Sequence, residues 1–187
     1  MFLTDWIYHT LVWLGLVYED ITIAILGIDH AERETLLHTL GVDGQVAPRS
    51  LIAEEHVSDL MVNHVRFLSF DIDGRDCWRA HSAGANGVVY VVDATKPERL
   101  AECKAELDGL LGCQELKLIP FLVMGDGTPQ ALGEIDLRTR LGLLSGTTGK
   151  AAPQLPADVR PIELYMCSIA RSQGLVEAFG WLSRYIR

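Results

Sequence analysis

Basic residues are scarce in this sequence, and none of its segments concentrates them. The 187 residues include 16 Lys and Arg against 25 Asp and Glu, which gives a formal charge of −9. The first basic residue after the amino terminus is Arg33. Binding to a phosphate backbone requires a concentrated basic face, so we expect no nucleic-acid partner.

Long apolar runs and cysteine motifs are also missing. The longest nearly uninterrupted apolar run covers residues 11–17, well short of the roughly 20 residues that span a bilayer, so we expect no transmembrane segment. The four cysteines form no C-x-x-C pair, which argues against a disulfide framework or a zinc site and favours a reducing compartment. The remaining composition, 49% hydrophobic and 22% charged, is typical of one globular domain.

Apolar, β-branched runs alternate with helical periodicity after the first twenty residues. This pattern predicts six strands, at residues 21–28, 57–62, 65–72, 87–94, 118–125 and 161–169. It predicts helices at residues 1–18, 31–40, 97–111, 131–143 and 175–187. The result is an α/β fold, a six-stranded and mostly parallel sheet with helices on both faces, in which the 57–72 hairpin adds one antiparallel edge strand. Ligands of such sheets bind beyond the carboxyl ends of the strands.

The turn after the first predicted strand has the setting of a phosphate-binding loop. The P-loop motif is G-x-x-x-x-G-K-[ST], in which backbone N–H groups cradle phosphates, the lysine reaches the terminal phosphates and the hydroxyl binds magnesium. The sequence here is Gly27-Ile28-Asp29-His30-Ala31-Glu32-Arg33-Glu34-Thr35, and only Gly27 fits the motif.

The whole chain resembles the Sar-type small GTPases of the Sar/Arf group, which assemble the COPII vesicle coat at the endoplasmic reticulum. The resemblance is carried by MFLTDW at the start, LLHTL, FDI, VVYVVDATKPERLAECKAELDGLL, IPFLVMG, TTGK, RPIELYMCSIARSQG and EAFGWLSRYI. It implies a small-GTPase-like domain over residues 19–187, preceded by an amphipathic helix over residues 1–18. The positions equivalent to the family's nucleotide site are Gly27, Asp29, His30, Ala31, Glu32, Arg33, Glu34, Thr35, Asp71, Gly74, Asp126, Ser168 and Ile169.

The departures from the family pattern are concentrated at that site. Glu32, Arg33 and Glu34 replace the second glycine, the lysine and the magnesium-binding hydroxyl of the P-loop. The threonine of the first switch aligns with His56. In the second switch, Asp71 and Gly74 keep the D-x-x-G pattern, while Asp73 replaces a glycine and Arg75 stands at the water-positioning place. The base-reading N-K-x-D becomes Asp126-Gly127-Thr128-Pro129, and Cys167-Ser168-Ile169 keeps the family residues.

These substitutions oppose the binding of a nucleoside triphosphate. A carboxylate about 4 Å from a phosphate charge is repelled by roughly 4 kcal/mol at an effective dielectric near 20, and both Glu32 and Glu34 could impose this. We therefore predict no catalytic residue, no bound metal and no cofactor. If the nucleotide site survives, GTP or GDP would bind there with Mg²⁺, and the magnesium positions would be Glu34 and Asp71. We further predict that Arg33 pairs with Asp71, Asp73 or Glu34 in a network that fills the site.

The first seventeen residues place Phe2, Leu3, Trp6, Ile7 and Trp13 on one side of an amphipathic helix. The resemblance implies a helix that inserts into the membrane of the endoplasmic reticulum. Docking on a protein is the alternative, because no Lys or Arg in this helix would attract anionic lipid.

The sequence thus predicts a pseudo-GTPase, a Sar-like protein-binding module at the cytosolic face of the endoplasmic reticulum. Coat proteins, and a membrane surface contacted through the first helix, are its expected partners. Two alternatives remain open: a working GTPase of COPII assembly, and a structural subunit recruited from a Sar-type ancestor into an unrelated large complex.

Overall fold

The computed structural model describes residues 21–43, 57–62, 65–70, 84–127, 131–151 and 155–186. The predicted helix over residues 1–18, and with it Phe2, Leu3, Trp6, Ile7 and Trp13, lies outside these ranges. So do both switch positions named above, at His56 and over 71–75. Among the described residues, no helix is long and apolar enough to cross a membrane.

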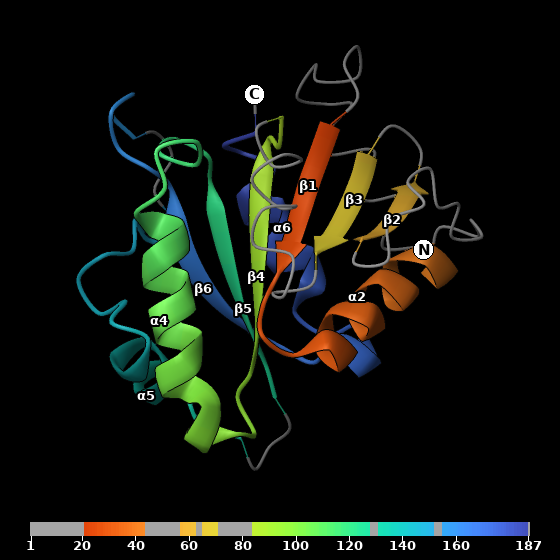
Figure 1. The fold of residues 1–187 in the computed structure, drawn as a ribbon, viewed down its shortest axis with the longest axis horizontal. Coiled ribbons are helices and arrows are strands. Elements are labelled where there is room, and N and C mark those ends of the chain that lie inside the picture. The colour runs from red at the N-terminus through yellow and green to blue at the C-terminus, as the bar shows by residue number, and fades with distance from the viewer. Residues whose placement is uncertain are drawn as a thin grey trace.

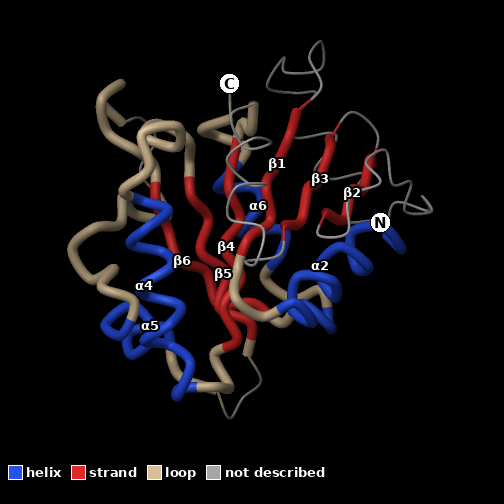
Figure 2. Tube along the Cα trace, viewed as in Figure 1, coloured by secondary structure: helices blue, strands red, loops and turns tan. Residues whose placement is uncertain are grey.

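One six-stranded sheet forms the centre of the molecule, as the sequence predicts (Figure 2). Its strand order is β2-β3-β1-β4-β5-β6. All neighbours are parallel except β2 and β3, which form the antiparallel hairpin at one edge. The strands are β1 (Ile21–Leu26), β2 (Val57–Val62), β3 (Val65–Phe70), β4 (Gly87–Asp93), β5 (Phe121–Asp126) and β6 (Ile162–Cys167).

Helices cover both faces of the sheet, with α4 in front and α6 behind in Figure 1. The helical elements are α2 (His30–Asp43), η2 (Pro97–Arg99), α4 (Leu100–Leu111), α5 (Glu134–Arg140), η3 (Ile169–Arg171) and α6 (Leu175–Leu182). Side chains of α2 and α6 share one apolar core, and those of α4 and α5 share the other. Because alternate residues of a strand face opposite sides, Ile23 and Ile25 enter the first core while Ala24 and Leu26 enter the second. This explains why the central strands are continuously apolar.

The start of β5 differs from the sequence-based expectation. The apolar run predicts a strand from residue 118, but the ladder begins at Phe121. Leu118 is 55% exposed, and Ile119 N–H donates to the Leu116 carbonyl within a turn. Pro120 has no N–H to donate to a ladder, so a proline immediately before Phe121 delays the strand.

Two helices are shorter than predicted. Helix α5 starts at Glu134, after Gly133 in an extended conformation, and ends before Gly142, whose φ of +74° is left-handed. Helix α6 ends at Leu182, where the Ser183 hydroxyl donates to the Gly180 carbonyl at 3.0 Å. A side chain that bonds to the preceding turn favours termination.

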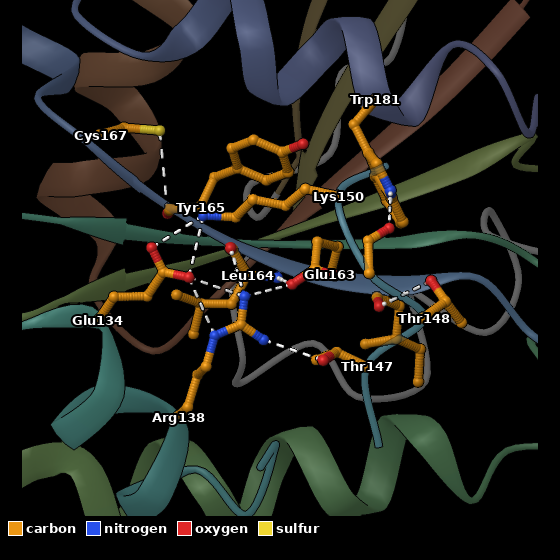
Figure 3. A network of polar contacts seen from close by, with 12 residues as sticks. Glu134, Arg138, Thr147, Thr148, Lys150, Glu163, Leu164, Tyr165, Cys167 and Trp181 are labelled. Atoms are coloured by element: carbon orange, nitrogen blue, oxygen red, sulfur yellow. Dashed lines mark hydrogen bonds and ion pairs between the residues drawn. The ribbon is translucent and has the colours of Figure 1, made fainter. Parts of the chain in front are cut away.

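A buried ion pair fastens α5 to the edge strand β6 (Figure 3). Glu163 is only 1% exposed and contacts the Arg138 guanidinium. Arg138 also binds Glu134 at 2.8 Å and donates to Thr147 Oγ1 at 3.0 Å. Lys150 pairs with Glu134 at 2.8 Å. The network therefore joins α5, β6 and the 147–150 loop.

Candidate functional site

The loop between β1 and α2 lies against β4, and Gly27 makes this possible. Gly27 has a φ of +143°, and a Cβ atom there would lie 2.3 Å from the Val91 carbonyl oxygen. A side chain would thus be excluded by both conformation and space. The retained first glycine of the P-loop motif therefore has a structural reason that is independent of any ligand.

Arg33, which stands in the place of the P-loop lysine, is fully buried. Its Nη1 donates to the Gly27 carbonyl, and its Nε donates to Ser69 Oγ on β3 at 3.3 Å. Nη2 lies 3.4 Å from Nδ1 of His30. The guanidinium therefore holds the loop to the sheet from inside. Two of its predicted partners, Asp71 and Asp73, lie outside the described residues, so the predicted network with them stays a prediction.

Lys96, which follows β4, forms ion pairs with two carboxylates at the carboxyl edge of the sheet. Its ammonium group lies 2.6 Å from Asp29 and 2.8 Å from Asp93, and Arg99 approaches Asp29 at 3.5 Å. Burial alone would raise the pKa of Asp93, but hydrogen bonds from Lys96 and Thr95 outweigh it and lower that pKa. Hydrogen bonds to Asp29 and Asp93 raise the pKa of Lys96. This exposed cation is thus engaged by the protein itself.

Glu32, at the place of the second P-loop glycine, reaches across to β5. Its carboxyl group lies beside that of Asp126. Burial first, and then the adjoining carboxyl group of Asp126 and the charges of Asp93 and Asp29, raise the pKa of Glu32 to about 7. Asp126 Oδ1 also accepts a hydrogen bond from the Ile169 N–H at 2.8 Å. One connection therefore runs from α2 through β5 to the loop after β6.

A cavity of about 320 Å³ lies beside this connection. Its lining comprises Gly127, Met166, Cys167, Ser168, Arg171, Gln173 and Gly174. Burial is the main cause that raises the pKa of Cys167 to about 12, so its thiol stays protonated and is not a nucleophile. The cavity corresponds in place to the base-reading loops predicted from the sequence.

The remaining predicted site residues in the first turns of α2 are more exposed than Arg33. His30 and Ala31 are exposed, and Glu34 and Thr35 are half-buried. The Thr35 hydroxyl donates to the Ala31 carbonyl at 2.7 Å. Asp71 and Gly74 lie outside the described residues. Within the described ranges, His, Cys, Asp and Glu side chains form no group of three that could hold a metal ion.

Sequence reasoning missed several residues that build this site. Asp93 is the last residue of β4 and Lys96 follows that strand at the carboxyl edge, where the rule for ligand positions in parallel sheets could have found them. Arg171 and Gln173 line the cavity, but no residue motif points to them. Ser69 receives Arg33 from β3, and only the three-dimensional pairing reveals it.

A mostly parallel sheet of this order, with a glycine loop between its first strand and the helix that follows, defines the fold of the P-loop small GTPases. Residues 7–186 match the ADP-ribosylation factor family. The chain belongs to this family, and it is of the Sar/Arf type.

Relatives align over nearly the full length. A small COPII coat GTPase SAR1 from Nicotiana tabacum is 34% identical, with all of both chains covered. A small COPII coat GTPase SAR1 from Giardia intestinalis is 29% identical, over 97% of this chain and 98% of its own. ADP-ribosylation factor K from Dictyostelium discoideum is 30% identical, over 88% of this chain and 85% of its own.

Proposed function

We propose that this chain is a Sar-type pseudo-GTPase that binds proteins without a guanine-nucleotide switch. The observation that carries the proposal is that the carboxyl group of Glu32, on the phosphate side of the site, lies beside that of Asp126 on its base side and has its pKa raised to about 7. A glycine and an asparagine would leave this space to a ligand, whereas the two carboxyl groups occupy it with each other.

The charges at the site support the same proposal. Asp29, Glu32, Asp93 and Asp126 gather where a triphosphate would bring further negative charge. A single carboxylate about 4 Å from a phosphate charge opposes binding by roughly 4 kcal/mol at an effective dielectric near 20. Arg33 is buried against the Gly27 carbonyl and Lys96 is held by two carboxylates, so neither replaces the P-loop lysine. This donor set does not fit a magnesium triphosphate.

Membership of the family supports a place in vesicle transport. Two relatives are named as COPII coat GTPases, so coat proteins at the cytosolic face of the endoplasmic reticulum are the proposed partners. The first eighteen residues would dock on the membrane or on such a protein. Recruitment into an unrelated complex remains the alternative use of the same module.

A second candidate, a working GTPase, is favoured by the cavity of about 320 Å³ at the base position. Titration with a fluorescent GDP analogue separates the two. We expect no saturable binding by the wild-type chain. The variant Glu32→Gly/Arg33→Lys/Glu34→Thr/Asp126→Asn should gain affinity by at least about a hundredfold, since it removes three negative charges from the site. Tight binding by the wild-type chain would favour the working GTPase.

Purification of the protein from native cells, followed by identification of bound proteins, tests the partner class. Recovery of COPII coat subunits would support the proposed pathway. Recovery of the subunits of one unrelated assembly would instead favour the structural-subunit alternative, and a variant truncated before Ile21 would show whether the first twenty residues are needed for either.

A further inference from the structure

The edge of the sheet opposite the P-loop carries a second and larger hollow. This pocket, of about 670 Å³, lies where β4, β5 and β6 begin and where α6 has ended. Figure 1 shows that β4 begins at the same edge as β1, away from the loop that joins the end of β1 to α2. The pocket is therefore separate from the nucleotide site, and a ligand can occupy it whether or not a nucleotide binds.

Most of the residues that line this pocket have apolar side chains, and three of them are prolines. Pro120, Pro156 and Pro161 line it together with Leu155, Leu118 and Val159. Prolines have no N–H group, so an occupant would be recognised by its side chains rather than by a backbone ladder. The volume lies within the range of about 300–1,000 Å³ that is usual for binding pockets.

Hydrogen bonds hold the walls in place. The Arg160 guanidinium donates to the Lys117 and Leu111 carbonyls, each at 2.8 Å, and stacks 5.4 Å from the centre of the Phe121 ring. These contacts tie the segment that precedes β5 to the entry of β6. On the other side, Asn86 Oδ1 accepts from the Thr22 N–H at 2.9 Å. A pocket that is already formed loses less conformational entropy on binding.

Two exposed apolar side chains belong to the lining of the pocket. Among the described residues, four large apolar side chains are exposed: Leu118, Ile135, Leu144 and Val159. Two of the four, Leu118 and Val159, flank this one pocket, with 55% and 39% of their surface exposed. Exposed apolar side chains at an open pocket suit a segment of polypeptide better than a small molecule that would be enclosed.

Among the described residues that line the pocket, Arg184 carries the only charged side chain. Its Nη1 donates to the Lys150 carbonyl at 3.2 Å, which fixes the guanidinium at the pocket mouth. The chain as a whole carries a charge of −9, so an acidic partner would be repelled over most of the surface and attracted here.

We propose that this pocket binds an apolar peptide segment of a partner protein, with a carboxylate of that segment placed on Arg184. The aliphatic or aromatic side chains of the segment fill the proline-lined hollow and cover Leu118 and Val159. The site thus gives the chain a protein-binding surface that is independent of the switch regions.

Selection of random peptides displayed on phage against the immobilised full-length chain tests this proposal. We expect enriched peptides that combine aliphatic or aromatic residues with an Asp or Glu. Absence of enrichment over the bare support, or enrichment of peptides without an acidic residue, would overturn it.

The enriched peptide, made synthetically, is then titrated into variants of the whole chain. Val159→Asp and Leu118→Asp should each weaken binding at least about tenfold, because they place a charge in the apolar contact. Ile135→Asp, a change at an exposed apolar residue outside the pocket, should leave the affinity unchanged. Equal binding by Val159→Asp and Leu118→Asp would place the peptide elsewhere and overturn the proposal.

The role of Arg184 has its own control. Arg184→Gln should weaken binding about threefold to fivefold, as expected for an exposed ion pair. The same substitution should have no effect on a peptide whose acidic residue is replaced by its amide. Arg140→Gln removes an exposed arginine on α5 and should leave both peptides unaffected. Weakening by Arg184→Gln that is equal for the acidic and the amide peptide would contradict the proposed contact.

Discussion

The carboxyl group of Glu32, in the first turn of α2, lies beside that of Asp126 at the end of β5. Two adjacent carboxyl groups repel each other unless one of them keeps its proton, and here burial and the Asp126 carboxyl group raise the pKa of Glu32 to about 7. The two residues replace a glycine and an asparagine of the family pattern. The two substitutions thus bring two acidic side chains together at this site.

This pair makes the stability depend on pH in a defined direction. The pKa of Glu32 is about 7 in the folded protein and near its ordinary value of 4.5 when unfolded. The folded state thus binds the proton more tightly, and its contribution is present at low pH and is lost as pH rises from about 4.5 to about 7. Relative to Glu32→Gln, the wild-type free energy of unfolding should fall by about 1 kcal/mol over this interval, a value reduced for partial exposure.

Urea unfolding of the two proteins at a series of pH values measures this difference. Glu98→Gln, at an exposed residue of η2, is the control and should run parallel to wild type. A difference between wild type and Glu32→Gln that stays constant with pH would show that the carboxyl pair does not hold a proton.

Lys96 should contribute more to stability than another lysine of equal exposure. Lys96→Gln leaves Asp29 and Asp93 side by side without their shared cation, and their side chains are only 14% and 10% exposed. We expect the free energy of unfolding to fall by about 1–2 kcal/mol. Lys104 is also 41% exposed, and it pairs with Asp108 on the surface of α4. Lys104→Gln should therefore change the free energy of unfolding by less than about 0.5 kcal/mol. Equal losses of unfolding free energy for Lys96→Gln and Lys104→Gln, measured by chemical unfolding, would contradict a stabilising role for the Lys96 ion pairs.

Gly27 and Gly109 should respond to alanine with opposite signs. At Gly27 the added methyl group would meet the Val91 carbonyl at 2.3 Å with φ at +143°, so Gly27→Ala should lower the free energy of unfolding by about 3 kcal/mol. Gly109 lies within α4 with open space around it, so Gly109→Ala should raise it by about 0.5–1 kcal/mol. Thermal unfolding of both variants measures the two changes in stability. An unchanged unfolding temperature for Gly27→Ala would contradict the close packing of Gly27 against Val91.

The buried ion pair of α5 and β6 predicts a large effect from a single substitution. Arg138→Met leaves the carboxylate of Glu163 buried without its cation and should lower the free energy of unfolding by about 3–5 kcal/mol. Arg140→Met, on the same helix at an exposed position, should change it by less than about 0.5 kcal/mol. Similar midpoints for both variants in urea would show that Glu163 is not charged in the folded protein.

The fold was predictable because its central strands are apolar on both faces. The alternation of Ile23 and Ile25 with Ala24 and Leu26 needs helices on both sides, and the sequence supplies them. The predicted start of β5 was wrong, because Leu118 and Ile119 have the composition of a strand but lie in a turn before Pro120. Apolar composition does not distinguish residues of a ladder from residues that line a surface pocket.

The sequence predicted which residues form the candidate site better than it predicted the contacts between them. Motif comparison found Gly27, Glu32, Arg33 and Asp126, because each occupies a position with a known role in the family. It could not foresee that Glu32 meets Asp126, since this depends on how α2 and β5 approach each other. Nor did it foresee that the guanidinium of Arg33 would turn inward to a backbone carbonyl, because local sequence does not fix the path of a long side chain.

The central claim is that the protein does without guanine nucleotide, and its most direct test is the nucleotide content of the purified chain. The protein is isolated in buffer that contains Mg²⁺, denatured, and the released nucleotides are separated and quantified against the protein concentration. We predict far less than one guanine nucleotide per chain. Release of one GDP or GTP per chain would contradict the claim.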